Sequence, residues 1–363
     1  MKQSHIYTDQ SGVRIEYTTF APAGHLAETH VMLHSTRIDT SFVRQYADLQ
    51  QALRRFVSQM GHATIMMRRI FLSDATNQMP LIDDADQSTS IIQQPPLDGS
   101  KVAIWAYIHQ GKSNYKQQWH MTQIVPEGDS YHQATTLLQQ YEKELEEQGG
   151  TLADNCIRTW FFVRDVDTQY HGLVVGRREN FETQGLTPNT HYIASTGIHG
   201  IPANTKAIIQ LDTYTIFGLK PKQQTYLHAH THLNPTYQYG VTFERGVKID
   251  YADRSHIYIS GTASINNRGE VEHTGDITRQ THRMWENVEA LLAEGGAKWT
   301  DVMQIIVYLR DIADYNHVCQ QFADKFPDTP HVITYAPVCR PSWLIEMECM
   351  AIIPNNDPSV KPY

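Results

Sequence analysis

One order of apolar and polar positions recurs three times along this chain of 363 residues. In each copy, apolar residues at helical spacing come first, and an apolar segment of strand length follows. In the last copy, Met284, Val288 and Leu291 share one helix face, and glycines follow each helical segment as expected stops. The pattern predicts first helices at Tyr46–Met60, Tyr131–Gln148 and Thr281–Ala293.

A predicted strand follows each helix and closes on the same ending. Each ending places Ser or Arg after apolar residues and then Asp, which gives the three copies a common register. These strands are Thr64–Asp74, Asn155–Asp165 and Asp301–Asp311. A second helix and an apolar strand pair complete each copy, with closing strands at Lys101–Ile108, Lys206–Ile216 and Ser342–Ile352.

The repeat predicts an α+β protein of three modules, at residues 1–112, 113–222 and 223–363. Glycine-containing links separate the modules. Mixed strands and helices in only three copies favour a closed ring, a pseudo-trimer within one chain, over an open stack of repeats. Such a ring needs no further assembly, so we expect a monomer. The Pro-rich tail Pro354–Tyr363 is predicted to be loose.

Composition narrows the class of protein. Hydrophobic residues make up 40% of the chain, enough for a core, and the net charge is −9 with no basic run. An acidic chain argues against nucleic acid as a partner. No apolar stretch has the length of a membrane span, and the start lacks a signal-peptide core. The cysteines show no CxxC pairing, so we expect free thiols in the cytoplasm: Cys156, Cys319, Cys339 and Cys349.

The third module resembles the RidA/YjgF family. The resemblance rests on Ser260-Gly261, Gly269, Gly275-Asp276, Gln280, Asn287, Leu291-Leu292, Gly295, Asp301-Val302 and the closing strand Leu344–Ala351. It implies a module that forms trimers with pockets at the subunit interfaces. Three such modules in one chain would form up to three pockets, each free to diverge.

Most of the chain also resembles the chorismatases, a RidA-related family with a longer chain. The matching segments, in the family's order, are Arg158-Thr159-Trp160, Gly176–Phe181, Tyr239–Gly246, Ser260–Ile265 and Cys339–Glu346. This resemblance implies an enzyme that cleaves the enol-pyruvyl ether of chorismate or a related small carboxylate. Its partner is then a small anionic metabolite, and neither a cofactor nor a metal is expected.

Three departures keep other functions open. The stretch Pro330–Ile333 lacks the Arg with which RidA deaminases hold a substrate carboxylate, and Cys319 stands at that family's Asn. Gly240 is followed by Val241-Thr242, where chorismatases have Pro-Arg. The alternatives are a RidA-like hydrolase of enamines or imines and a small-molecule-binding protein without catalysis.

Ether cleavage starts with protonation of the vinyl CH2, which requires a general acid with a raised pKa. Glu346 lies in an otherwise apolar strand and is predicted to be this acid/base. Alternation places Glu348 on the same face as its neighbour. The alternative for both is a pair of structural carboxylates bound to Arg.

Guanidinium groups suit the two carboxylates of such a substrate. Arg340 is the first candidate, followed by Arg245 and Arg178, whereas Arg158 is expected to form a structural ion pair. Cys339 is a candidate for steering a nucleophilic water, or else a small buried side chain.

Further candidates line the predicted site. Tyr239 is a candidate hydrogen-bond donor to the substrate, or else an ordinary core aromatic. Gly261 and Thr262 are predicted at a strand end where backbone approaches the ligand.

A histidine cluster stands apart from these motifs. If LHAHTHLN is a strand, alternation puts His228, His230 and His232 on one face. Three imidazoles can bind zinc, but no nearby Asp, Glu or Cys completes the set, so a polar strand face is the preferred interpretation.

Overall fold

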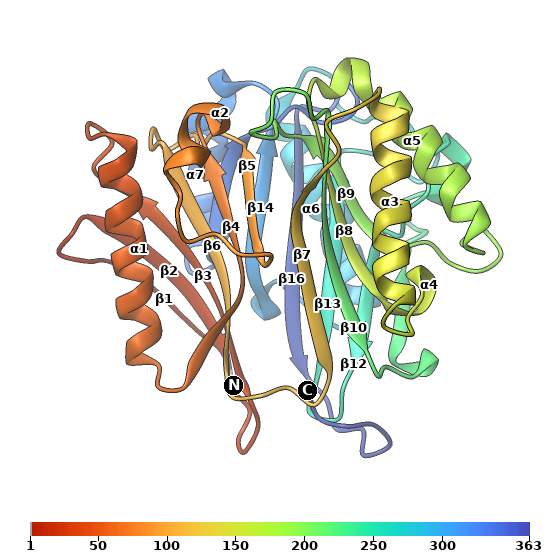
Figure 1. Ribbon diagram of the computed structural model, residues 1–363, viewed down its shortest axis with the longest axis horizontal. Coiled ribbons are helices and arrows are strands. Elements are labelled where there is room, and N and C mark those ends of the chain that lie inside the picture. The colour runs from red at the N-terminus through yellow and green to blue at the C-terminus, as the bar shows by residue number, and fades with distance from the viewer. Residues whose placement is uncertain (1) are drawn as a thin grey trace.

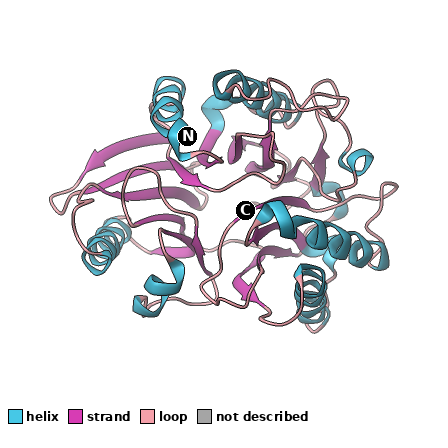
Figure 2. Ribbon diagram, turned by 90° about the horizontal axis from the view of Figure 1, so that it is seen from above, coloured by secondary structure: helices cyan, strands magenta, loops and turns pink. Residues whose placement is uncertain are grey.

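A computed structural model describes residues 2–363, apart from the side chain of Tyr239. The chain forms three mixed sheets with helices on their outer faces (Figures 1 and 2). The strand orders are β1-β2-β3-β6-β4-β5, β7-β10-β8-β9 and β11-β12-β13-β16-β14-β15. The fold is therefore α+β with three modules, as the pattern predicted. The module limits at residues 112 and 222 stay predictions.

The first and third modules begin with two strands that the second module lacks, and from β3, β7 and β13 onward the main elements follow the same order in each module. The first holds β1 (Lys2–Thr8), β2 (Val13–Phe20), β3 (Ala27–Ser35), α1 (Phe42–Gln59), β4 (Ala63–Leu72), α2 (Ala75–Gln78), η1 (Met79–Leu81), β5 (Thr89–Gln93) and β6 (Val102–Gln110). The second holds β7 (Lys116–Ile124), α3 (Ser130–Glu146), α4 (Leu152–Asn155), β8 (Cys156–Val163), α5 (Val166–Thr183), β9 (Ala194–His199) and β10 (Ile209–Phe217). The third holds η2 (Pro221–Gln223), β11 (Gln224–Leu227), η3 (Thr236–Tyr239), β12 (Gly246–Asp250), β13 (Arg254–Ala263), α6 (Ile277–Glu294), η4 (Trp299–Asp301), β14 (Val302–Leu309), η5 (Ile312–Asp314), α7 (Tyr315–Lys325), β15 (His331–Tyr335) and β16 (Ile345–Pro354).

The common register predicted from the Asp endings is present in all three sheets. In each module, one strand ends two residues before the Asp: β4, β8 and β14. Each of them pairs antiparallel with the closing strand of its module, and its last residue lies opposite the first residue of the closing strand. These pairs are Leu72 with Val102, Val163 with Ile209, and Leu309 with Ile345. A parallel strand borders the other side of each: β5, β9 and β15. Equivalent positions can therefore be compared between modules.

Each module contacts both others, which closes the ring. Isolated backbone pairs cross all three interfaces, between Gln93 and Ile201, Ala194 and Glu244, and Pro96 and Thr334. Figure 2 shows the strands gathered inside and the helices around them. The chain is thus an intrachain pseudo-trimer.

The first module departs from the repeat at its second helix. Here α2 has one turn, Ala75–Gln78, whereas α5 has 18 residues and α7 has 11. Pro80 follows within η1 and, lacking an N–H, does not suit a longer helix.

The tail was predicted to be loose, and that prediction is wrong. Tyr363 is 2% exposed, and its hydroxyl lies 2.8 Å from that of Tyr107 and 2.9 Å from Gln117 Oε1. Its ring centre lies 4.4 Å from that of His256. Because these three residues come from three different modules, Tyr363 fills the place where the modules meet.

Candidate active site

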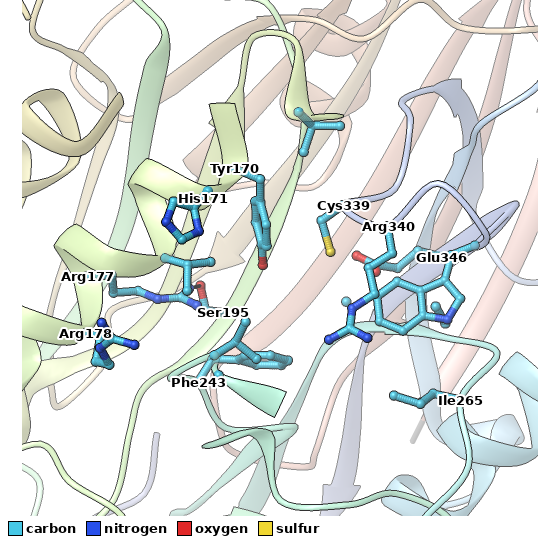
Figure 3. Close-up of a pocket in the computed structure, with 18 of the residues that line it drawn as sticks. Tyr170, His171, Arg177, Arg178, Ser195, Phe243, Ile265, Cys339, Arg340 and Glu346 are labelled. Atoms are coloured by element: carbon cyan, nitrogen blue, oxygen red, sulfur yellow. Dashed lines mark hydrogen bonds between the residues drawn. The ribbon is translucent and has the colours of Figure 1, made fainter. Parts of the chain in front are cut away.

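A cavity of about 630 Å³ lies at the interface of the second and third modules (Figure 3). The second module contributes α5 and β9, and the third contributes β13, β16 and two loops at residues 240–245 and 339–343. The first module does not line it. The helix α5 forms the second module's wall of this cavity. Its equivalent in the first module, α2, has only one turn.

Glu346 lies in the wall of this cavity. It is the second residue of β16, pairs with Ala263 and Tyr308, and is 5% exposed. Burial, and next the charge of Glu348, raise the pKa of Glu346 to about 8, while Arg245 and Arg158 act in the opposite direction. The carboxyl is therefore mostly protonated at neutral pH and can donate a proton to a bound ligand.

Gly261 gives that carboxyl its space. A Cβ at this position would stand 2.2 Å from Glu346 Oε1 and 3.0 Å from the Thr196 methyl. Any side chain larger than hydrogen would therefore displace the acid.

Glu348, two residues further along β16, lies outside the lining of the cavity. It accepts hydrogen bonds from an Arg158 guanidinium nitrogen at 2.9 Å and from Trp160 Nε1 at 2.8 Å. Thr196 donates a third. The two carboxylates thus differ: Glu348 is held in an ion pair with Arg158, and Glu346 faces the cavity.

Guanidinium groups surround the rest of the cavity. Arg177 on α5 is 1% exposed and Arg245 is 4% exposed, and their guanidinium carbons lie 5.9 and 5.4 Å from the centre of the Phe243 ring. Arg340 lies 5.1 Å over the Trp343 ring. Arg178 lines the cavity from an exposed position. Positive charge therefore lines the cavity from the second module, through Arg177 and Arg178, and from the third, through Arg245 and Arg340.

Cys339 is half-buried beside this acid. Burial, and next the charge of Glu346, raise the pKa of its thiol to about 12, against a hydrogen bond with Tyr170 and the charge of Arg340. The thiol stays protonated at neutral pH and is not a thiolate nucleophile. Steering a water by hydrogen bonding remains compatible with this state.

Two further candidates lie elsewhere. Thr262 is buried, outside the cavity lining, and its hydroxyl donates to the Ser260 carbonyl at 2.9 Å. Tyr239 ends η3, and its side chain lies outside the described part of the chain.

Sequence reasoning missed the lining that α5 and β9 contribute, chiefly Tyr170, His171, Arg177 and Ser195 (Figure 3). Arg177 donates to Ser195 Oγ at 3.4 Å. The signal for Arg177 was its place beside Arg178 in the Gly176–Phe181 segment. No local pattern shows that these residues would face a cavity shared with another module.

The strand predicted for the histidine cluster is wrong. β11 ends at Leu227, and Ala229 has a left-handed φ of 47°, so the alternation stops there. The rings of His228 and His230 stack at 5.1 Å, while His232 Nδ1 lies 2.8 Å from Thr231 Oγ1. Within residues 2–363 no group of three or more His, Cys, Asp or Glu is placed to hold a metal ion.

Comparison with known proteins identifies the class. The family model described as Endoribonuclease L-PSP matches residues 243–353. A RutC family protein of Pyrococcus abyssi is 35% identical over 98 residues, which are 26% of this chain and 76% of that protein. The 3-aminoacrylate deaminase RutC of Acinetobacter baylyi is 30% identical over 97 residues, 26% of this chain and 77% of that protein. The chain belongs to this RutC family, the RidA/YjgF-type proteins that its third module resembles.

A solved structure extends the likeness beyond one module. A chorismatase crystal structure matches with a TM-score of 0.63 at 17% identity, over 79% of this chain and 93% of that chain. The likeness is one of fold, and it agrees with three RidA-like modules in one chain. In the described chain, no helix has the length and apolar character needed to cross a membrane.

Proposed function

We propose that the cavity between the second and third modules binds a small anionic metabolite and that Glu346 protonates it at carbon. The chemistry we infer is cleavage of the enol-pyruvyl ether of chorismate or a related small carboxylate. One observation carries this proposal: a buried carboxyl whose pKa is raised to about 8 faces a cavity lined by guanidinium groups.

The reaction divides into a protonation and a hydration. Glu346 gives its proton to the terminal CH2 of the enol ether, which leaves an oxygen-stabilised cation at the adjacent carbon. Water adds to that carbon while the Glu346 carboxylate takes up a proton from it. In the resulting hemiketal, the bond between the hemiketal carbon and the ring oxygen breaks while the hydroxyl proton passes to that oxygen. Pyruvate and the ring alcohol are released, so that one water is consumed for each ether cleaved.

The remaining candidates take supporting roles. Arg340, Arg245 and Arg177 are positioned to bind the substrate carboxylates, and Arg178 to attract them at the rim. Cys339 offers a neutral thiol that can hydrogen-bond the attacking water. Tyr239 stays a predicted hydrogen-bond donor to the substrate.

A second candidate is hydrolysis of enamines. The relationship to a 3-aminoacrylate deaminase favours it, because an enamine, like an enol ether, is protonated at carbon. The same Glu346 proton would give an iminium ion, and water would then release ammonia. The two activities therefore share an acid and differ in product, pyruvate or ammonia.

The test is incubation of the full chain with chorismate, with pyruvate release followed by a coupled lactate dehydrogenase assay. We expect release by the unchanged protein and a loss of at least about a hundredfold in Glu346→Gln, the usual contribution of a general acid. Glu142→Gln is the matched control. The Glu142 carboxyl is also buried, with its pKa raised to about 7 by burial, but it lies on α3, outside the cavity lining.

The outcomes separate the candidates. An equal loss of pyruvate release in Glu346→Gln and Glu142→Gln would contradict a specific role for Glu346. Ammonia from 3-aminoacrylate without pyruvate from chorismate would favour the enamine reaction. Absence of both products from folded protein would leave binding without catalysis.

Location and assembly complete the proposal. All four cysteines are free thiols, which fits a reducing compartment, and we place the protein in the cytoplasm. Because the closed ring already joins all three interfaces, we infer a monomer.

A further inference from the structure

A threonine of the second module binds both strands that surround the acid. Thr196 lies on β9, is 1% exposed and lies outside the lining of the cavity. Its hydroxyl accepts the Gly261 N–H at 2.9 Å and an Arg158 guanidinium N–H at 2.6 Å, and it donates to Glu348. A hydroxyl offers one donor and two acceptor positions, so this one is fully used.

The Gly261 N–H is available for this bond because β13 bulges there. The pairing of β13 with β16 shifts register between Ile259 and Thr262, so that Gly261 has no partner residue on β16. The same bulge brings Gly261 against Glu346, where a Cβ would stand 2.2 Å from Oε1. Thr196 therefore fixes the piece of backbone that faces the acid.

The interface of the first module with the second repeats this contact. Ser90 on β5 and Thr196 on β9 each lie three residues before the last pair of their strand. The Ser90 hydroxyl donates to Asp212, which holds on β10 the position of Glu348 on β16. The buried Arg69 accompanies them, with Nε 3.3 Å from Ser90 Oγ and Nη2 3.5 Å from Asp212 Oδ2. A hydroxyl, a carboxylate and an arginine thus meet at both interfaces.

The two interfaces differ in what their bulge donates to. β7 carries the same bulge opposite β10, and Thr122 holds the position of Gly261. The Thr122 N–H donates directly to Asp212 Oδ1 at 2.7 Å. In the third module the Thr196 hydroxyl accepts the equivalent N–H instead. The bulge therefore supplies a donor that binds a carboxylate unless a hydroxyl accepts it.

That difference falls beside the acid. Gln210 and Ala103 hold the position of Glu346 in the other two modules, so only the bulge of the third module faces a carboxyl there. An N–H that donates to a carboxylate stabilises its ionised form. The titratable or charged side chains that act on Glu346 or line the cavity beside it are those of Glu348, Arg158, Arg245, Arg340, Cys339 and Tyr308.

We infer that Thr196 is a positioning residue, which ties Gly261 and Glu348 to the second module and keeps the Gly261 N–H from the Glu346 carboxyl. The docking of the second module thereby prepares the acid of the third. The effect of Thr196 on turnover rests on the proposed function, whereas its effect on the protonation of Glu346 does not.

Thr196→Val tests this in the full chain, because it removes the hydroxyl at nearly unchanged shape. The freed Gly261 N–H and a loosened bulge that admits water both favour the ionised form of Glu346. The donor lost to Glu348 acts in the opposite direction, but the Arg158 guanidinium still binds that carboxylate.

Carbon-13 NMR of labelled glutamate side chains measures the protonation directly, with Glu346→Gln to assign the signal. We expect the midpoint of the Glu346 titration to fall from about pH 8 to about pH 7, a tenfold lower proton affinity. Pyruvate release by Thr196→Val should then fall about fivefold at pH 8 and less than about twofold at pH 6. A general loss of structure would lower release at both pH values.

Three variants complete the test. Thr196→Ser keeps the hydroxyl and should restore both the midpoint and pyruvate release. Thr196→Ala removes the hydroxyl without a branched side chain, which guards against a folding defect in Thr196→Val, and it should lower the midpoint in the same way. Ser90→Ala is the matched control: it removes the equivalent hydroxyl where the bulge faces Gln210, and both measurements should be unchanged.

The NMR titration decides the inference even without turnover. A midpoint that stays or rises in both Thr196→Val and Thr196→Ala would overturn it, and so would an equal fall in Ser90→Ala. If the midpoint falls as expected while the unchanged protein releases no pyruvate, the role of Thr196 holds and the proposed reaction fails.

Discussion

Replacing the acid should stabilise the protein while inactivating it. The pKa of Glu346 is raised from its ordinary value of 4.5 to about 8, mainly by burial. Between these values the folded protein holds a proton that the unfolded chain has lost. The stability of the folded state is therefore intact below about pH 4.5 and falls as pH rises toward 8.

The size of this effect follows from the same values. At about 1.4 kcal/mol for each tenfold change in proton affinity, a rise from 4.5 to about 8 corresponds to at most about 5 kcal/mol. In Glu346→Gln the side chain cannot ionise, so this loss disappears. We expect the variant's advantage in free energy of unfolding to be about 3 kcal/mol larger at pH 8 than at pH 5.5.

Urea unfolding of both proteins at the two pH values measures this difference. Glu348→Gln, two residues along the same strand, is the matched control and should behave in the opposite way. It removes the partner of the buried Arg158 guanidinium and should lower the free energy of unfolding by about 3–5 kcal/mol. If the difference in free energy of unfolding between the unchanged protein and Glu346→Gln is the same at pH 5.5 and pH 8, the Glu346 carboxyl does not titrate between these values and the reasoning is refuted.

Further predictions concern turnover, reactivity and the core. Turnover of the substrate should fall about tenfold per pH unit above about pH 8, where Glu346 loses its proton, and a flat pH–rate profile would contradict its role as acid. Gly261→Ala should reduce pyruvate release at least about tenfold, because the new methyl takes the place of the carboxyl; near-normal kinetics would refute this. With a thiol pKa of about 12, Cys339 should react with iodoacetamide at pH 7.5 about a thousandfold more slowly than glutathione, as peptide mapping would show, and comparable rates would speak against that environment. Tyr363→Ala should lower the free energy of unfolding by about 3–5 kcal/mol in urea, and a change below about 1 kcal/mol would mean that the tail is dispensable.

The fold could be predicted from the sequence because its signals are local. The Asp endings mark where three equivalent strands stop, and each closing strand starts its pairing at that end. Strand alternation fails as a guide in the histidine segment. Ala229 has a left-handed backbone conformation that ends the strand, and no pattern of residues predicts that conformation.

The site was only partly predictable for a different reason. Strand alternation places Glu346 and Glu348 on one face, but it does not show which of them is the acid. Arg158, from another module, pairs with Glu348 and leaves Glu346 as the carboxyl that faces the cavity. Arg177 and Tyr170 likewise reach the cavity through the docking of α5 onto the third module. The Arg158–Glu348 contact joins residues 190 positions apart, and no local periodicity encodes such a contact.

Joining three modules in one chain limits how much the buried Glu346 carboxyl lowers the stability of the folded state. In a ring of identical subunits, a buried carboxyl like Glu346 would occur at every interface, and its destabilisation at neutral pH would be incurred three times. Here the equivalent positions are Gln210 and Ala103, which carry no charge. The chain tolerates one such acid because the equivalent positions at the other two interfaces are free to be neutral, and directed evolution can therefore alter this position without altering its counterparts.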